Sequence, residues 1–309
     1  MRARYLMLIA IWGASFLLIK IGLEALAPIQ LVLGRMAFGT ATLLAVTVVR
    51  RVLLPREPRL WGHLFVTATL SNTVPFMLFA YAEQRIPSAV ASVCNATAPL
   101  FTLLIALLAL PGERPTAKRG LGLVLGFVGV AVVFGVWDTA GARPDPTGVL
   151  LGLGATVCYG AGHVYLRRYL SATPYSGLAL TAVQLFIGTL QLAMIAPLAT
   201  SVPDHVPARV VLAVLVLGAL GTGVGYVFQY ALIRGPGPTV ASTVTYCTPV
   251  VSISLGVIVL GEQLTWNAPL GAAIIIAGAL LTRAPRAPTS ARRLAVAPIS
   301  RTPWIRGLQ

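Results

Sequence analysis

The sequence predicts an all-α integral membrane protein whose ten transmembrane helices form two inverted five-helix repeats. Three observations support this prediction. Of the 309 residues, 57% are apolar and 10% are charged, whereas a soluble domain carries about 25% charged residues. The chain divides into ten apolar runs, and a spanning helix needs about 20 such residues. One segment of the first half also recurs in the second half, and an internal repeat of this kind determines the architecture.

The repeat is most evident in residues 88–134 and 237–281. Each segment carries a Val-Ala-Ser triplet, a proline within an apolar run and a Gly-Glu pair at the next boundary. Matching residues lie 150 positions apart up to the proline and 149 after it. The Trp-Gly-Ala at 12–14 matches the Tyr-Gly-Ala at 159–161, 147 positions later. Because five is odd, the second half enters the membrane from the opposite side, as in many secondary transporters.

Short breaks rich in proline and glycine separate the expected helices. The ten expected spans cover residues 5–25, 29–49, 61–81, 88–110, 118–136, 148–167, 176–198, 208–232, 238–260 and 266–283. The expected units are a first repeat (1–136), an inter-repeat loop (137–147), a second repeat (148–283) and a basic tail (284–309). The tail is rich in Pro, Ser and Arg without a long apolar run, so we expect it to be disordered.

The distribution of Lys and Arg predicts that both termini are cytoplasmic, because cytoplasmic loops are enriched in these residues. With the amino terminus inside, the inner segments before the tail hold twelve of them: Arg2, Arg4, Arg50, Arg51, Arg56, Arg59, Arg114, Lys118, Arg119, Arg167, Arg168 and Arg234. The outer side holds four: Lys20, Arg85, Arg143 and Arg209. We expect a multi-pass protein in the cytoplasmic (inner) membrane of a bacterium.

Neither the charge nor the motifs predict another class of protein. The net charge of +15 lies in the breaks between apolar runs, with no motif for nucleic-acid binding. There is no G-x-S-x-G, Walker or H-E-x-x-H motif. Cys94, Cys158 and Cys247 fall inside apolar runs without CxxC spacing, which is typical of small buried residues. We expect no enzyme activity, cofactor, metal site or nucleic-acid partner.

Three charged residues lie within or near the ends of apolar runs. Lys20 is within about two turns of the outer surface, and is either an interfacial anchor or a cation that faces a cavity and attracts a carboxylate. Arg35 lies about 10 Å below the outer boundary. We expect Arg35 to be a structural charge, paired with Glu24 or with carbonyls at a helix end. Glu83, one turn inside the outer edge, is the best candidate for a coupling proton.

Two prolines at matching positions, Pro99 and Pro249, fall near the centre of their helices. Each removes a backbone hydrogen bond, and such kinks either line a cavity, act as hinges or merely suit packing. Polar residues just before them are Asn95, Thr97, Tyr246 and Thr248. Asn72 and Thr73 in the third run, and Tyr226 in the eighth, lie in segments that correspond through the repeat. Small and hydroxyl residues also join helices, so each has a packing alternative.

Motifs in a specific order across both halves now identify a resemblance. They are Trp12 to Phe16 (WGASF), Lys20, Gly22, Pro28, Arg35, Tyr81-Ala82, Ala91-Ser92, Ala98 to Thr102 (APLFT), Gly112 to Arg114 (GER) and the helix with Gly122 and Gly129. With their second-half counterparts, they resemble the EamA-type permeases of the drug/metabolite transporter superfamily over residues 5–283. The resemblance implies ten spans in two inverted halves, a central cavity and alternating access. It also implies export or exchange of small metabolites, amino acids or drugs.

The resemblance and the residues together predict a secondary transporter with a small-molecule substrate in the lipid bilayer. The predicted substrate-binding residues are Lys20, Asn72, Thr73, Asn95, Thr97, Tyr226, Tyr246 and Thr248. Lys20 matches the cation of the family's first helix, whereas Glu83 and Asn95 replace residues that are usually apolar. Relatives in the small multidrug resistance branch carry a Glu in the first helix, so Lys20 disfavours cationic-drug/proton antiport. The alternative is a membrane scaffold or sensor that acts through its basic tail, binding anionic lipid or a partner.

Overall fold

The computed structural model describes residues 2–110, 116–134, 144–201, 203, 205–234, 238–263 and 265–281. Every secondary-structure element within these ranges is a helix. Glu113, most of the expected inter-repeat loop and the expected basic tail lie outside the described residues. Below, residues 2–134 are called the first half and residues 144–281 the second half.

All ten expected apolar runs are helical, and several are interrupted. The first half contains α1 (Arg2–Gly22), α2 (Pro28–Val49), α3 (Pro58–Ala68), η1 (Thr69–Thr73), α4 (Val74–Glu83), α5 (Ser88–Asn95), α6 (Ala98–Ala109) and α7 (Ala117–Phe134). The second half contains α8 (Pro146–Tyr169), α9 (Gly177–Ala199), α10 (Ala208–Val216), η2 (Leu217–Val224), α11 (Gly225–Arg234), α12 (Pro238–Leu260) and α13 (Asn267–Leu281). The segments η1 and η2 are π-helical.

Proline and short polar residues determine where these helices begin. Pro28, Pro58 and Pro146 occupy the first turn of α2, α3 and α8, where a missing N–H costs no hydrogen bond. The carboxylate of Asp145 accepts a bond from the Thr147 N–H at 2.8 Å and caps α8. The local sequence thus places the helix starts close to their expected positions.

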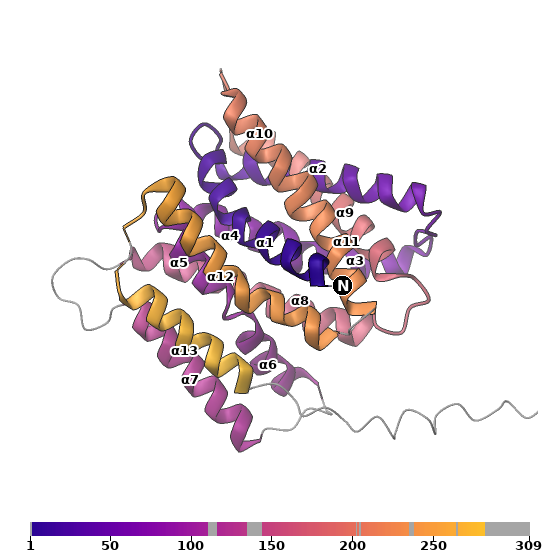
Figure 1. Ribbon diagram of the computed structural model, residues 1–309. Coiled ribbons are helices and arrows are strands. Elements are labelled where there is room, and N and C mark those ends of the chain that lie inside the picture. Colours follow the sequence, from indigo (N-terminus) through magenta and orange to yellow (C-terminus); the bar gives the residue numbers. More distant parts are fainter. Residues whose placement is uncertain are drawn as a thin grey trace, which may run out of the picture.

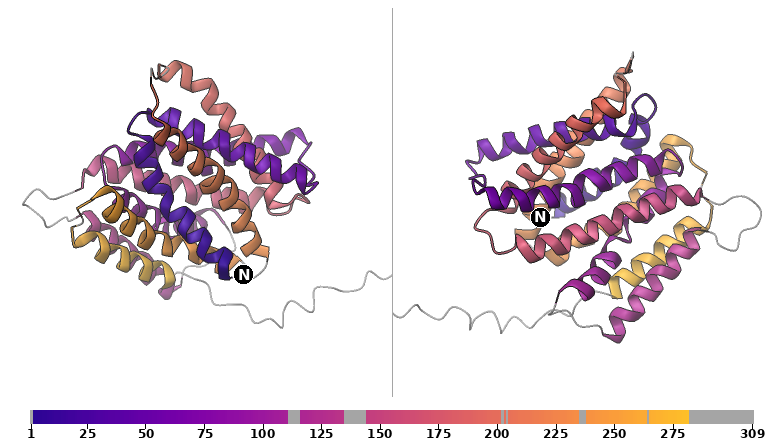
Figure 2. Two further views of the ribbon diagram at one scale, coloured as in Figure 1. Left: turned by 45° about the horizontal axis from the view of Figure 1, so that its top comes forward. Right: turned by 180° about the vertical axis from the view of Figure 1, so that it is seen from behind.

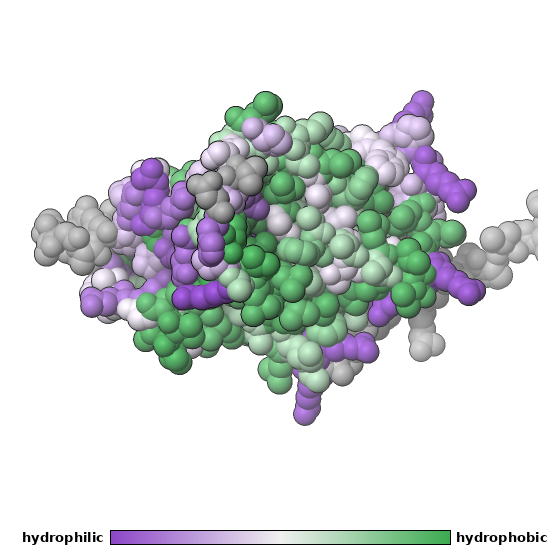
Figure 3. Space-filling view, turned by 90° about the horizontal axis from the view of Figure 1, so that it is seen from above, coloured by the Kyte–Doolittle hydropathy of each residue, from purple (hydrophilic) through white to green (hydrophobic). Residues whose placement is uncertain are grey.

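The surface and helix lengths are those of a multi-pass membrane protein. Among the described residues, seven helical runs are long and apolar enough to cross a membrane: Arg2–Gly22, Pro28–Val49, Pro58–Glu83, Ser88–Ala109, Pro146–Tyr169, Gly177–Ala199 and Ala208–Arg234. Val244–Leu260 and Asn267–Leu281 are shorter apolar helices. In Figure 3, apolar residues cover the middle of the visible face and hydrophilic residues gather toward its ends. A total of ten crossings stays a prediction.

The helices of the two halves pack directly against one another. Helices α7 and α13 lie side by side at one edge of the bundle (Figure 1), and both views of Figure 2 show the same pairing. Among the other contacts, α1 packs on α12, α2 on α9 and η2, and α8 on α4 and α6. The interface between the halves therefore runs through most of the molecule.

Several close contacts occur in pairs related by a shift of 149 residues. A Cβ atom built on Gly129 would lie 2.9 Å from the Gly271 carbonyl oxygen, and one on Gly278 would lie 2.6 Å from the Gly122 carbonyl oxygen. Adding 149 to 129 and 122 gives 278 and 271. Thr40 and Thr189, also 149 apart, share a hydrogen bond of 2.9 Å between their hydroxyls. The two halves thus use matching residues for the same kind of contact.

The two matching prolines have different backbone surroundings. Helix α5 ends at Asn95, residues 96–97 form a turn, and Pro99 lies in the first turn of α6. The new helix start accommodates the missing N–H of Pro99 without loss of a helical bond. In contrast, α12 continues through Pro249 as an α-helix. The sequence match at these prolines is therefore not accompanied by the same helix break.

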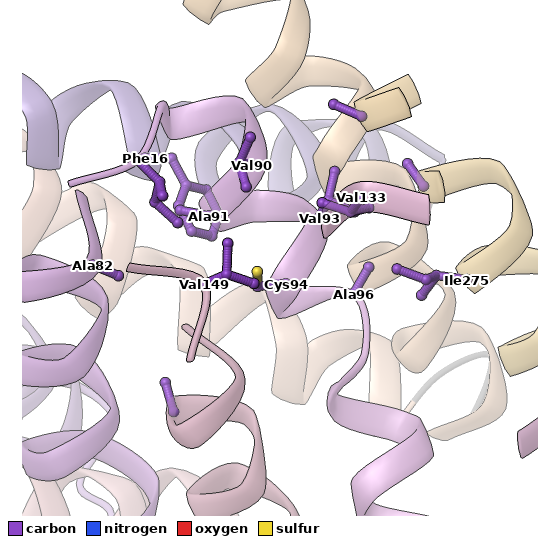
Figure 4. Packing of buried hydrophobic residues seen from close by; sticks show 14 of the residues in the cluster. Phe16, Ala82, Val90, Ala91, Val93, Cys94, Ala96, Val133, Val149 and Ile275 are labelled. Atoms are coloured by element: carbon purple, nitrogen blue, oxygen red, sulfur yellow. The ribbon is translucent and has the colours of Figure 1, made fainter. Parts of the chain in front are cut away.

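A cluster of buried apolar residues joins both halves around α5. Figure 4 shows members from α1, α4, α5 and α7 together with residues of α8 and α13. The labelled members are Phe16, Ala82, Val90, Ala91, Val93, Cys94, Ala96, Val133, Val149 and Ile275. Within lipid, such packing stabilises by close van der Waals contact, because lipid tails are as apolar as the side chains. This cluster holds α5 and the turn after it in place.

Candidate functional site

Charged side chains meet between the first helices. Lys20, in the last turn of α1, donates a hydrogen bond from Nζ to the backbone carbonyl oxygen of Glu83, the last residue of α4. The Glu83 side chain is fully buried, and neither carboxyl oxygen has a hydrogen-bond partner in the described structure. The charges of Lys20, Glu262 and Arg35 act on this carboxyl. The structure thus brings Lys20 and Glu83 together at the carboxyl ends of α1 and α4.

Arg35 extends from α2 toward both halves. Its Nε donates to the Thr222 hydroxyl of η2 at 3.0 Å. Its guanidinium carbon lies 3.8 Å from the centre of the Phe76 ring of α4. The expected partner Glu24 is wrong, because the Glu24 carboxylate pairs with Arg209 at 2.7 Å. Arg35 therefore joins α2 to the π-helical segment of the second half instead of to a surface acid.

Further aromatic side chains lie in the same region as this guanidinium. Tyr159 of α8 and Tyr226 of α11 are close enough to act electrostatically on Arg35. The Trp12 ring meets the Tyr226 ring edge-on, with centroids 6.4 Å apart. Trp12, Arg35, Tyr159 and Tyr226 are all half-buried. Four helices from both halves thus contribute partly accessible polar and aromatic groups to one region.

Asn72 and Thr73 of η1 belong to a hydrogen-bonded network. Asn72 Nδ2 donates to the Tyr226 hydroxyl at 3.1 Å, and Asn72 Oδ1 accepts from Gln184 Nε2 at 2.6 Å. Thr73 donates to Gln191 Oε1 at 2.7 Å. Gln184 also donates to the Thr67 carbonyl at 3.2 Å. Gln184 and Gln191 thus form interhelical hydrogen bonds to the first half, and Asn72 connects Gln184 to Tyr226.

The remaining predicted residues lie around the two prolines. Thr97 is buried and donates to the Cys94 carbonyl at 2.7 Å, with the Thr156 hydroxyl 3.1 Å away. Asn95, at the end of α5, is half-buried. In α12, Thr248 donates to the Thr245 carbonyl at 2.8 Å, and Tyr246 is buried in the apolar cluster around α5. Within the described part of the chain, no hydrogen bond joins Asn95, Thr97 or Thr248 to Lys20 or Arg35.

Glu262 holds the amino end of α5 from the other half. Its carboxylate accepts from the Ser88 N–H at 2.8 Å, the Ser88 hydroxyl at 3.0 Å and the Ala89 N–H at 3.2 Å. A carboxylate at a helix amino terminus satisfies free N–H groups and favours the helix dipole. Glu262 of the second half thus caps a helix of the first half.

Sequence reasoning missed Phe76, Tyr159 and Thr222 as neighbours of Arg35. The repeat offered a signal for one of them, because Thr222 lies 149 positions after Thr73. Among the described residues, no group of three or more His, Cys, Asp and Glu side chains is arranged to hold a metal ion. The arrangement is therefore suited to binding and moving a polar solute by charge, hydrogen bonds and ring contacts.

These features define a multi-pass helical membrane protein with charged and polar groups enclosed between two halves. The chain belongs to the EamA-like transporter family, whose model matches residues 4–135 and 146–284. The resemblance seen in the sequence is thereby confirmed. The family places the chain among membrane transporters rather than enzymes.

Relatives along nearly the whole chain are also named as transporters. An uncharacterized transporter of Archaeoglobus fulgidus is 26% identical over 87% of this chain and 94% of its own length. The inner membrane transporter YedA of Escherichia coli K12 is 26% identical over 88% of this chain and 86% of its own. A protein of known crystal structure shares the fold, with a TM-score of 0.65 and 22% identity over 95% of this chain and 98% of its own.

Proposed function

We propose that this protein is a secondary active transporter that exports or exchanges small metabolites, such as amino acids, by alternating access between its two halves. The observation that carries the proposal is the set of charged and polar groups enclosed between helices of a family member. Intramembrane ionisable residues are costly and mark pathways for substrates and ions. Lys20, Arg35 and Glu83 are residues of this kind.

The proposed architecture is ten spans in two inverted five-helix repeats, residues 1–136 and 148–283. Two separate matches to the same family model support it. The paired glycine contacts support it too, since each contact has a counterpart at 149 residues' distance. A hydrogen bond between matching residues, as between Thr40 and Thr189, is expected close to a two-fold axis. Transporters of this architecture bind substrate between the repeats, near the middle of the membrane.

The proposed substrate-binding residues come from both halves. The first half supplies Lys20, Asn72, Thr73, Asn95 and Thr97, and the second supplies Tyr226, Tyr246 and Thr248. The bond from Asn72 to Tyr226 supports this assignment, because it crosses from one half to the other. Such a bond must lengthen or exchange partners when the halves move. The break before Pro99 is the proposed hinge on one side, and Pro249 the proposed hinge on the other.

Glu83 is the proposed carrier of a coupling proton. A buried carboxyl without hydrogen-bond donors is costly in its ionised form, and the Glu83 carboxyl lacks such donors in the described structure. Movement of the halves that admits water or brings Lys20 to the carboxyl would favour release of the proton. We also propose the orientation with both termini in the cytoplasm, with the basic tail (284–309) on that side.

The test is uptake into proteoliposomes preloaded with candidate solutes, with and without a pH gradient. A transporter shows saturable uptake of a labelled solute that the unlabelled form inhibits. Lys20→Ala is expected to abolish this uptake while inserting normally. Arg209→Ala, which removes an exposed cation of the same outer surface, is the matched control and should retain uptake. Wild-type uptake by Lys20→Ala would reassign Lys20 as an interfacial anchor.

A further inference from the structure

The guanidinium of Arg35 has more donors than the protein satisfies. It carries five N–H groups. Apart from the bond of Nε to Thr222, Arg35 makes no hydrogen bond or ion pair with the described part of the chain. The Phe76 ring covers one face of the guanidinium. The two terminal nitrogens, which suit a carboxylate in a two-pronged arrangement, therefore remain available.

The equivalent residue of the second half shows that this position does not need a charge for packing. Gln184 lies 149 positions after Arg35, in α9, and also bonds to the π-helical segment opposite. Its amide donates to the Asn72 side chain and to the Thr67 carbonyl. Gln184 is buried and Arg35 is half-buried. A neutral amide thus joins the helices in one half, whereas the other half keeps a partly accessible cation.

No ion pair neutralises the Arg35 cation within the described structure. The carboxyl of Glu83 acts on Arg35 electrostatically without pairing with it, and Glu83 has a second cation beside it, because Lys20 donates to its backbone carbonyl. The negative charge of Glu262 is taken up by the amino end of α5. An arginine within the membrane is costly unless it faces water or an anion. The region is thus electrostatically suited to an anionic ligand.

The side chains near Arg35 indicate the chemistry of the uncharged part of that ligand. The Phe76 ring lies on the guanidinium, Tyr159 and Tyr226 are close enough to act on it electrostatically, and the Trp12 ring meets the Tyr226 ring edge-on. Aromatic rings provide large apolar contact areas, and the Asn72 and Tyr226 polar atoms already bond to each other. An apolar body can therefore pack on these rings while its charged group meets Arg35.

We propose that Arg35 is the carboxylate-binding residue of the transport site, and that the ligand class is a small organic carboxylate with an apolar body. This assignment rests on the proposed transport function and adds the substrate class to it. The two terminal nitrogens of Arg35 donate to the two carboxylate oxygens. Thr222 and Phe76 hold the guanidinium in place.

The experiment measures equilibrium binding to the purified full chain in detergent with two probes of the same shape. 3-Phenylpropanoate carries a carboxylate, and 3-phenylpropanamide replaces it with a neutral amide. We expect at least tenfold tighter binding of the carboxylate to the wild type, and loss of that preference in Arg35→Gln. Equal binding of the two probes, binding of neither probe, or an undiminished preference in Arg35→Gln would each overturn the assignment.

Two further variants keep the test decisive if Arg35→Gln folds poorly. Arg35→Lys keeps the charge without the two-pronged geometry and is expected to bind the carboxylate several-fold more weakly than the wild type. Arg209→Gln removes an exposed arginine and is expected to bind as the wild type does. If Lys20→Gln abolishes the preference and Arg35→Lys does not weaken it, the carboxylate site belongs to Lys20 and the proposal falls.

Transport assays separate failure of this assignment from failure of the transport function. If the proteoliposomes take up neutral or cationic solutes and Arg35→Gln leaves this uptake unchanged, the transport function stands and the carboxylate assignment falls. If carboxylate binding depends on Arg35 but no tested solute is transported, the binding site stands and the transport function falls.

Discussion

The two halves of the molecule share their packing and differ in their charges. Contacts made by small residues recur at a shift of 149: Gly39 approaches Thr222 and Gly188 approaches Thr73, each at 2.9 Å from a built Cβ atom. Some charges recur as well, since Arg85 corresponds to Arg234 and Glu113 to Glu262, but two charges between the helices do not. Arg35 corresponds to Gln184, and buried Glu83 corresponds to the buried Leu232. The comparison indicates that the scaffold is duplicated, while the charges of Arg35 and Glu83 have no counterpart in the second half.

This division has a physical reason. Helices in lipid associate through close backbone approach and interhelical hydrogen bonds, so both halves need small residues at the same contacts. A second buried cation or carboxyl would add a large desolvation cost without adding to packing. One set of charges placed between two halves is enough for the single site that we propose.

The largest expected effect comes from breaking the shared packing. Gly278→Val places a side chain 2.6 Å from the backbone of Gly122 and Gly126, which cannot move aside as a flexible side chain can. We expect overpacking to lower the free energy of unfolding by about 1–3 kcal/mol. Thermal unfolding in detergent would show a clear fall in Tm and in the yield of folded protein.

Gly129, the first-half residue that matches Gly278, allows a sharper test of this prediction. Gly129→Val, with backbone of Ile275 at 2.8 Å and of Gly271 at 2.9 Å, is expected to have an effect of similar size. Gly120→Val, on the same helix as Gly129 with no atom within 4 Å of the built Cβ, is the control and should leave Tm nearly unchanged. A normal Tm for either Gly129→Val or Gly278→Val would show that α7 and α13 do not pack as described.

A smaller loss of stability is expected from removing the side-chain amide of Gln184, the second-half residue equivalent to Arg35. Gln184→Leu deletes the bonds to the Thr67 carbonyl and the Asn72 side chain, at a cost of about 0.6–2 kcal/mol. Gln229→Leu is the matched control, because half-buried Gln229 has no hydrogen bond within the described residues. Equal Tm values for the two variants would contradict a structural role for Gln184.

Replacing Glu83 by the residue of the other half tests the difference in charge. Glu83→Leu removes a buried carboxyl without hydrogen-bond partners in the described structure. We therefore expect Tm to rise or stay level, with the free energy of unfolding raised by at most about 1 kcal/mol. The bond from Lys20 to the backbone of residue 83 is retained. If transport depends on a pH gradient in the wild type, that dependence should be lost. A marked fall in Tm would instead show that the carboxylate is ionised and stabilised by Lys20 or Arg35.

Much of the helical framework followed from sequence, and the side-chain partners did not. Apolar run lengths and prolines such as Pro28 and Pro146 placed helix starts within a few residues. Arg35 was expected to pair with Glu24 or with carbonyls at a helix end, and it bonds instead to the Thr222 hydroxyl, because partner choice depends on how each helix is rotated about its axis. Helices that are apolar on nearly all sides carry little periodic signal for that rotation. For these contacts, the most informative feature of the sequence was the comparison of individual residues that lie 149 positions apart.

The smallest expected effect lies at Asp145, outside the spanning helices, where the halves are joined by its ion pair with Arg85 at 3.2 Å. The Thr147 N–H and then Arg85 lower the pKa of Asp145 below its usual value. A lowered folded-state pKa means that the carboxylate stabilises the protein above the unfolded pKa of about 3.9, and that this contribution is lost as the pH falls through the folded-state pKa. We expect Asp145→Asn to lower Tm at pH 7 by about 1 °C, because exposed pairs contribute little, and the difference from the wild type to vanish in acid. A difference that grows on acidification would mean that Asp145 is not held as an ionised cap.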